Sequence, residues 1–162
     1  VLEDGLGHFA KICEETFDQV YKDVPGAGAA GGVGFGLLCF LNATLQPGIQ
    51  LVMEAVHLEE ALKEADLIIT GEGKIDVQSA MGKVPEGVLT LGKKHGIPTI
   101  ALGGMVTKDA QKLNDMGMAG CFAIIHEVLT LEEAMKKDVA RENIVHTMQQ
   151  IFQLVTSVKS MK

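Results

Sequence analysis

The residues best suited to chemistry lie in residues 68–83, IITGEGKIDVQSAMGK, where an apolar run is followed by charged side chains. The charged and glycine residues that follow the run are Gly71, Glu72, Gly73, Lys74 and Asp76. The run itself has the composition of a buried strand, and the two glycines let the backbone turn sharply at the strand's carboxyl end. Open α/β sheets bind ligands at the carboxyl ends of their strands, so we expect a ligand site here. The alternative is a solvated loop whose glycines serve only the turn.

These side chains match the needs of phosphoryl transfer. Glu72 and Asp76 could hold Mg²⁺, which proteins commonly bind through one or two carboxylates together with substrate phosphates. Lys74 or Lys83 could neutralise a phosphate, and Asp76 could also accept the proton of an attacking hydroxyl late in a loose transition state. No Walker A motif and no protein-kinase signature set occurs in the sequence.

A second candidate site is the glycine-rich stretch 25–36, PGAGAAGGVGFG, which contains a GxGxxG pattern at Gly26, Gly28 and Gly31. In a dinucleotide-binding fold this pattern follows a strand and brings a pyrophosphate to a helix N-terminus. Here the preceding residues, VYKDV, make a poor strand, and no acidic residue is placed to hold a ribose. Anion binding by the glycine-rich turn therefore remains open, as does plain close packing, whereas specific recognition of NAD is not expected.

Residues 24–53 carry no charge, which raises the question of a membrane span. Glycines, Pro25 and Pro47 interrupt the run, so we predict a buried, glycine-rich helix in its place. The net charge of -7 argues against a nucleic-acid binder, since such binding depends on Lys and Arg. Three widely separated cysteines, Cys13, Cys39 and Cys121, predict a reducing, cytoplasmic setting and buried thiols. The chain opens on Val, and we expect a fragment or a processed product.

The apolar periodicity predicts the elements that position these residues. Helices are expected at residues 5–19, 58–65, 85–95, 107–116 and from Thr130, whose capping box with Glu133 would open the last helix. Strands are expected at 66–70, 98–102 and 120–125, and residues 49–56 could form either element. Strand and helix thus alternate from residue 66 onward, which predicts a parallel sheet whose carboxyl-end loops converge on one crevice. His126 closes the third strand and is a candidate of second rank there.

Three stretches together resemble the class I bacterial glycerate kinases. They are VPGAGAAGGVGFG at 24–36, ADLIITGEGKIDVQSAMGKVPEGV at 65–88 and IPTIALGG at 97–104. The resemblance extends over nearly the whole chain. It implies ATP-dependent phosphorylation of D-glycerate with Mg²⁺, in a two-domain α/β enzyme whose crevice holds both substrates.

One departure matters for function. Members of this family are considerably longer and begin with a strand and a DSFKGS-type loop, which does not occur here. The chain resembles only their carboxyl-terminal portion, and the family's two domains are interleaved in sequence. We therefore expect residues 1–64 to be a helical, glycine-rich segment of one domain and residues 65–162 to be a Rossmann-like α/β portion of the other. The chain would need the missing N-terminal portion as its partner and would be inactive without it.

The resemblance places two groups of residues at the family's cleft. The roles within these groups are assigned from side-chain chemistry. Catalytic roles fall on Asp76 and Lys74, and metal binding falls on Glu72 and Asp76. Substrate or nucleotide binding falls on Gly28, Gly31, Gly32, Gly71, Gly73, Ser79 and Lys83. A non-catalytic nucleotide- or phosphate-binding module is the main rival, and an NAD-dependent oxidoreductase is the second. The sequence leaves open the oligomeric state and which glycerate hydroxyl is phosphorylated.

Overall fold

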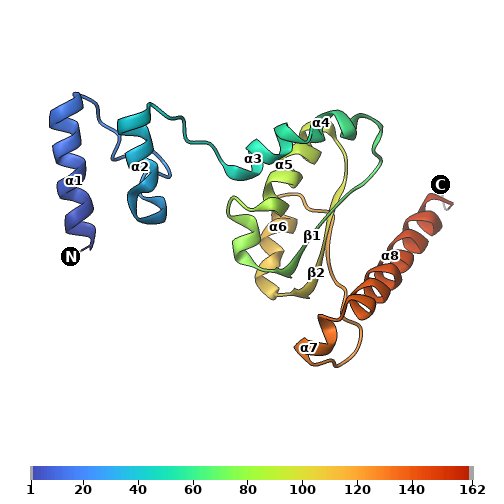
Figure 1. Cartoon of the computed structure of the whole chain (residues 1–162). Coiled ribbons are helices and arrows are strands. Elements are labelled where there is room, and N and C mark those ends of the chain that lie inside the picture. Colours follow the sequence, from blue (N-terminus) through green and yellow to red (C-terminus); the bar gives the residue numbers. More distant parts are fainter. Residues whose placement is uncertain (1, 161–162) are drawn as a thin grey trace. The chain divides into compact units, whose positions relative to one another are not determined.

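The computed structural model describes residues 2–160 and divides the chain into two compact units, Val1–Pro47 and Gly48–Lys162 (Figure 1). Each unit has hydrophobic core clusters built only from its own residues. The division expected after residue 64 concerns the domains of a longer enzyme and stays a prediction.

The first unit contains two helices, α1 (Leu2–Phe17) and α2 (Ala29–Leu41). Helix α1 confirms the amphipathic helix expected at residues 5–19. Its core consists of Ala10, Cys13, Ala27, Phe35 and Leu38. The prediction of a buried second helix is largely wrong, because α2 buries Phe35 and Leu38 but leaves Val33 and Phe40 each 57% exposed. A pair of helices can cover only one side of α2, and the apolar side chains on its other side stay in contact with solvent.

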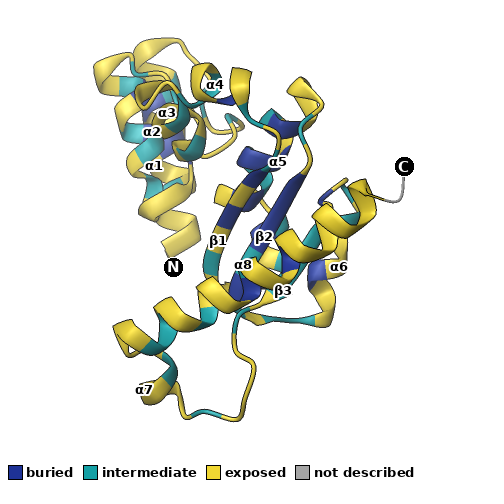
Figure 2. Cartoon of the chain, turned by 90° about the vertical axis from the view of Figure 1, so that its right-hand side faces the viewer, coloured by how far each residue is buried: buried dark blue, intermediate teal, exposed yellow. Residues whose placement is uncertain are grey.

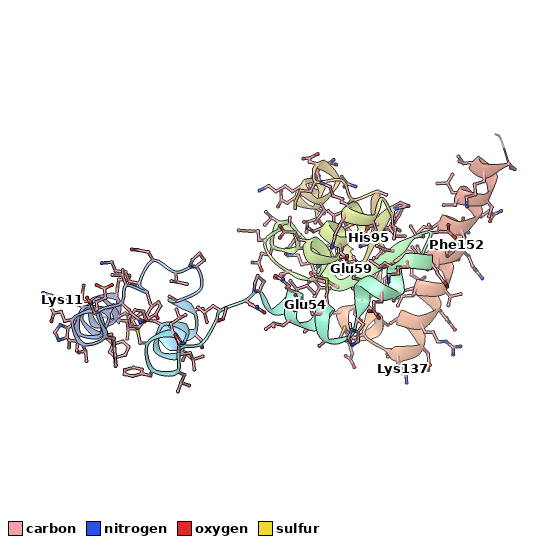
Figure 3. All side chains as sticks on the ribbon, turned by 90° about the horizontal axis from the view of Figure 1, so that it is seen from above. Lys11, Glu54, Glu59, His95, Lys137 and Phe152 are labelled. Atoms are coloured by element: carbon pink, nitrogen blue, oxygen red, sulfur yellow. The ribbon has the colours of Figure 1, made fainter. Side chains whose placement is uncertain are left out.

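The second unit opens with three short helical segments, α3 (Gly48–Ala55), α4 (Leu58–Ala61) and the 3₁₀ helix η1 (Leu62–Glu64). Of residues 49–56, which the sequence left open, all but the last are therefore helical. Glu59 of α4 meets His95 at the end of the next long helix, where Glu59 Oε1 and His95 Nε2 are 2.8 Å apart (Figure 3).

A parallel sheet with strand order β1-β2-β3 forms the centre of the second unit. Its strands are β1 (Ile68–Ile75), β2 (Thr99–Val106) and β3 (Gly120–Ala123). The crossovers contain the 3₁₀ helix η2 (Val77–Ala80) with α5 (Val84–His95), then the 3₁₀ helix η3 (Lys108–Ala110) with α6 (Gln111–Asp115). The α/β class and the parallel sheet predicted from the alternation of elements are confirmed.

Both long strands run further than predicted. Residues 71–75 were expected as a loop, but β1 pairs with β2 as far as Ile75 opposite Val106. The glycines explain the difference, because a Cβ at Gly71 would lie 3.0 Å from the carbonyl oxygen of Leu102 and one at Gly104 would lie 2.8 Å from that of Gly73. These glycines let the two strand ends approach closely instead of turning the chain.

The sheet and α5 supply most of the buried residues of the second unit (Figure 2). Ile75, Leu89, Ala101 and Leu113 are 2% exposed or less and form one cluster with Ala110 and Met118. Helices α5 and α6 lie on one side of the sheet and a long C-terminal helix lies on the other (Figures 1 and 2). The carboxyl end of β1 is thus held by a packed core, while its charged residues remain accessible.

The C-terminal segment forms two helices where one was predicted, α7 (Leu131–Ala134) and α8 (Lys137–Lys159). The capping box of Thr130 and Glu133 exists but opens only the four-residue α7, and Lys136 is extended before α8 begins. Within residues 2–160, no helix has the length and apolar character that crossing a membrane requires.

Candidate functional site

The carboxyl end of β1 and the turn after it carry the charged residues singled out in the sequence. Glu72 and Lys74 lie in the last half of the strand, Asp76 is the N-cap of η2, and Ser79 is the third residue of that 3₁₀ helix. The strand fixes the first two side chains and the cap fixes the third. The structure therefore brings all four residues into one turn at the edge of the sheet where ligands bind in open α/β folds.

Ser79 connects the two carboxylate residues of this turn. Its side chain is fully buried, its Oγ donates to Glu72 Oε2 at 2.9 Å, and it accepts the backbone N–H of Asp76 at 3.3 Å. Both bonding directions of the hydroxyl are used within the turn. Ser79 thus orients Glu72 and has no exposed atom to offer a ligand, and direct ligand contact by Ser79 stays an untested prediction.

Asp76 is the most strongly paired charge of the site. Its Oδ2 lies 3.1 Å from Lys74 Nζ, and its Oδ1 accepts the backbone N–H of Gln78 at 2.9 Å. The hydrogen bond from Lys74 and then that from Gln78 lower the pKa of the Asp76 carboxyl, and the charge of Lys83 adds to this effect. Asp76 is therefore ionised at neutral pH, which suits binding a cation more than abstracting a proton.

Lys83 reaches the same turn from the start of α5. Its Nζ donates to the side-chain oxygen of Gln78 at 3.1 Å, and Lys83 is the N-cap residue of the helix. Gln78, which contacts both Asp76 and Lys83, was missed in the sequence. The signal for it is an aspartate two residues before it, because Asp side chains commonly accept the N–H two positions on.

Glu72 and Asp76 can supply part of a cation site. Among residues 2–160 no group of three or more His, Cys, Asp or Glu side chains is arranged to hold a metal ion. A complete protein cage for a cation is therefore absent from this part of the molecule. Mg²⁺ bound by one or two carboxylates, with phosphates and water as the other ligands, fits the donor set.

Gly71 and Gly73 lie inside β1. Gly71 packs closely against β2, as described above, whereas a Cβ added at Gly73 would have no neighbour within 4 Å. Neither glycine adopts a positive φ. Ligand binding by these two residues stays a prediction that nothing in the geometry tests.

The glycine-rich block belongs to the first unit and forms a left-handed turn at the start of α2. Ala30, Gly31 and Gly32 have φ values of 52°, 69° and 88°. Gly28 precedes this turn as N-cap, and a Cβ at Gly32 would lie 2.6 Å from Leu6 Cδ2 of α1. The described part of residues 1–47 contains no strand, so the strand that a dinucleotide fingerprint requires before its glycines is missing.

The fold agrees with that of a solved structure that the chain matches. The glycerate kinase family model matches residues 1–156. The chain belongs to the glycerate kinase family.

Curated relatives in this family include a glycerate kinase of Halalkalibacterium halodurans, 42% identical over 84% of this chain and 36% of that protein. A glycerate kinase of Bacillus subtilis is 37% identical over 99% of this chain and 42% of that protein. The glycerate 2-kinase of Escherichia coli is 42% identical over 83% of this chain and 35% of that protein. The chain thus spans between a third and a half of the length of the curated relatives it matches.

A solved structure supports the fold assignment within the family. A Salmonella typhimurium LT2 protein, whose crystal structure was solved as a candidate glycerate kinase 2, has a TM-score of 0.62 and is 35% identical. The match covers 91% of this chain and 39% of that one.

His126 has a structural contact in this family member. The Thr147 hydroxyl donates to the Asn143 carbonyl at 2.8 Å, so its oxygen is left to accept from His126 Nε2 at 3.0 Å. The imidazole also stacks edge-on against His146, with ring centroids 4.7 Å apart. His126 therefore ties the loop after β3 to α8, which accounts for its place without a catalytic role.

Proposed function

We propose that this chain is the carboxyl-terminal part of an ATP-dependent glycerate kinase that transfers the γ-phosphoryl group of ATP to a hydroxyl of D-glycerate. Membership of the glycerate kinase family supports the reaction class. The coverage of 35–42% of the relatives supports the inference that further residues are needed for a complete crevice. The isolated chain is then inactive.

The turn after β1 would serve as one wall of that crevice. Glu72 and Asp76 would hold Mg²⁺, which when bound offsets the negative charge of the ATP phosphates. Lys74, 3.1 Å from Asp76, and Lys83 would neutralise the transferred group. Gly28, Gly31 and Gly32 would present backbone N–H groups to a phosphate.

Asp76 would also be the residue that takes the proton of the attacking hydroxyl. Its lowered pKa makes it a weak base, so it would orient the hydroxyl and accept the proton late. Ser79 would keep the Glu72 carboxylate in one orientation from beneath.

The observation that carries this proposal is the connected set of Glu72, Lys74, Asp76 and Ser79 at the carboxyl end of β1, the end of a strand where open α/β sheets bind ligands. The test is an ATP- and Mg²⁺-dependent glycerate phosphorylation assay on two proteins, the chain alone and the chain extended through the N-terminal portion its relatives have. We expect turnover only in the extended protein. Equal turnover in both would contradict the need for the missing portion.

Asp76→Asn in the extended protein should reduce turnover by orders of magnitude while the fold is kept. Glu15→Gln is the matched control, since Glu15 is an exposed carboxylate of α1 whose Oε1 lies 3.9 Å from Nζ of the equally exposed Lys11. Unchanged turnover in the Asp76 variant would remove Asp76 from the catalytic set.

The alternative is a nucleotide- or phosphate-binding module without catalysis. The glycine-rich block and the lysines of the turn after β1 would also allow such a module. Such a module would bind ATP with Mg²⁺ in calorimetry but show no turnover in either the chain or the extended protein. Titration with NADH should show no saturable binding in either case.

A further inference from the structure

Two of the three cysteines meet in the core of the first unit. Cys13 on α1 is 3% exposed, and Cys39 on α2 packs partly buried against the same cluster. Both side chains belong to one core cluster, Cys13 as a buried member and Cys39 packed against it. Residues far apart in the sequence are thus brought together at the place where the two helices touch.

We propose that Cys13 and Cys39 are a thiol–disulfide site, which a low-molecular-weight disulfide such as oxidised glutathione converts into a covalent link between α1 and α2. The shared core cluster brings these two cysteines near each other from two different helices. Cysteines that are near each other can be bridged with little movement of the chain, whereas distant cysteines would require the backbone to move. This site does not depend on the proposed kinase activity.

The reaction proceeds by two exchanges. Cys39, the more exposed thiol, loses its proton and attacks one sulfur of the external disulfide, which forms a mixed disulfide and releases one small thiol. Cys13 then attacks the Cys39 sulfur, and the second small thiol leaves with the remaining proton. Two protein thiols are oxidised and one external disulfide is reduced to two thiols.

The surroundings make this exchange slow but direct it toward the internal link. Burial, the neighbouring Cys13 thiol and the Glu14 carboxylate raise the pKa of Cys39 above its ordinary 9.0. Apolar neighbours and a nearby carboxylate disfavour a thiolate and favour a neutral product. A bulky mixed disulfide would have to be accommodated beside the buried Cys13, so the compact internal disulfide should replace it.

The titratable groups near the pair are few. Glu14 directly follows Cys13 on α1, and its buried Oε1 has no hydrogen-bond partner within the described residues. Its Oε2 lies 3.6 Å from Lys22 Nζ, and Tyr21 packs against the same core. Oxidation should therefore accelerate as the pH rises toward and past 9, and Glu14→Gln should accelerate it further at a fixed pH by removing a negative charge.

Cys121 provides the internal comparison. It lies on β3 in the second unit, where burial raises its pKa, and residues 48–162 contain no other cysteine with which it could pair. Within its own unit Cys121 thus has no cysteine with which to form an internal disulfide.

The link would act on the helix that carries the glycine-rich block. Helix α2 begins with the left-handed turn of Ala30, Gly31 and Gly32, and Cys39 lies near the other end of the same helix. A bond from Cys39 to Cys13 would fix this helix to α1, and with it the base of the glycine-rich block.

The test uses the chain with Cys121→Ala, incubated natively with oxidised glutathione at about pH 8.5, in the alkaline range where more thiolate is available. We expect a monomer that has lost both free thiols and whose mass is lower by two hydrogens, with one disulfide-linked peptide joining Cys13 and Cys39. Peptide mapping of the oxidised unmodified chain should show the same link. In Cys39→Ser, Cys13 should stay reduced because it is buried.

Three results would overturn the proposal. Glutathione could remain on Cys39 while Cys13 stays reduced, the product could be a covalent dimer, or both thiols could stay unreacted although they react in the urea-denatured chain. Each of these results would show that Cys13 and Cys39 do not form a disulfide although they lie in one cluster.

Discussion

Ser79 is the residue on which the arrangement of the polar turn depends most, because one buried hydroxyl bonds both Glu72 and the backbone of Asp76. Ser79→Ala removes the hydroxyl without changing the shape of the core and leaves a half-buried carboxylate short of a donor. We expect the free energy of unfolding to fall by about 1–3 kcal/mol, measured by urea denaturation.

Ser157→Ala is the matched control for this variant. The Ser157 side chain is exposed on α8, and its hydroxyl donates only to the Gln153 carbonyl of its own helix. Its removal should change the free energy of unfolding by less than about 0.5 kcal/mol. Equal losses in the two variants would mean that Ser79 does not hold the turn together.

At this scale the sequence predicts which charges gather but not how each one is engaged. Glu72, Lys74 and Asp76 follow an apolar run, and chain geometry alone places them at one strand end. The burial of Ser79 depends on η2 folding back against β1, a contact between side chains seven residues apart. No local pattern encodes such a contact, so the sequence does not predict the hydrogen bond from Ser79 to Glu72.

Glycines show the same limit at the scale of elements. The sequence places turns after residue 70 and at Gly103, because glycine is common in turns, yet β1 and β2 continue to Ile75 and Val106. Glycine also occurs where two backbones approach closely. Only the position of the partner strand shows whether a glycine forms a turn or a close strand contact. Amphipathic helices were predicted more securely, since their apolar period is a property of the segment itself.

Gly92 is the position where α5 touches the sheet most closely. A Cβ there would lie 3.0 Å from Ile68 Cδ1 and 3.1 Å from the Ile97 carbonyl oxygen, and closer still to the Thr99 hydroxyl. Gly92→Ala should push α5 away from β1 and β2 and lower the free energy of unfolding by about 1–3 kcal/mol.

Gly36→Ala tests whether the effect of Gly92→Ala is one of space. Gly36 lies inside α2 with nothing within 4 Å of an added Cβ, so alanine there should stabilise its helix by up to about 1 kcal/mol. Thermal and urea denaturation of both variants give the comparison. A loss at Gly36 or a gain at Gly92 would contradict the packing argument.

The contact between α4 and the end of α5 predicts a pH dependence. Hydrogen bonds from Lys94 and then from His95 lower the pKa of Glu59 in the folded chain. Because the folded pKa is depressed, the pairing stabilises the fold above the unfolded value of about 4.3 and is lost as the pH falls through the folded value. Glu59→Gln should thus lower the midpoint of thermal unfolding at pH 7, and the difference from the unmodified chain should shrink below about pH 4. A constant difference across this range would show that the charge is not responsible.

At the scale of the whole molecule, the sequence predicts the parallel sheet but not the division into two units. Regular alternation of strands and helices after residue 66 is enough to predict a parallel sheet, since such crossovers join parallel strands. The division at Pro47 is not visible in composition, because the uncharged stretch 24–53 continues across it. The division depends on which apolar residues pack together in the folded chain, and the linear sequence does not show this packing.

The second unit should therefore fold when Gly48–Lys162 is produced alone. Its core clusters, around Leu89 and Leu113 and around Leu62 and Ile68, draw on no residue before Gly48, and all three strands lie within it. We expect one cooperative urea transition and, for β1 to β3, the same amide NMR shifts as in the full chain. The first unit, at 47 residues, is near the size at which a single core barely suffices, and its exposed Phe40 and Leu41 leave that core small. It should be only marginally stable by itself. If Gly48–Lys162 gave a poorly dispersed spectrum while the full chain gave a dispersed one, its cores would need the first unit, and the division at Pro47 would not be a folding boundary.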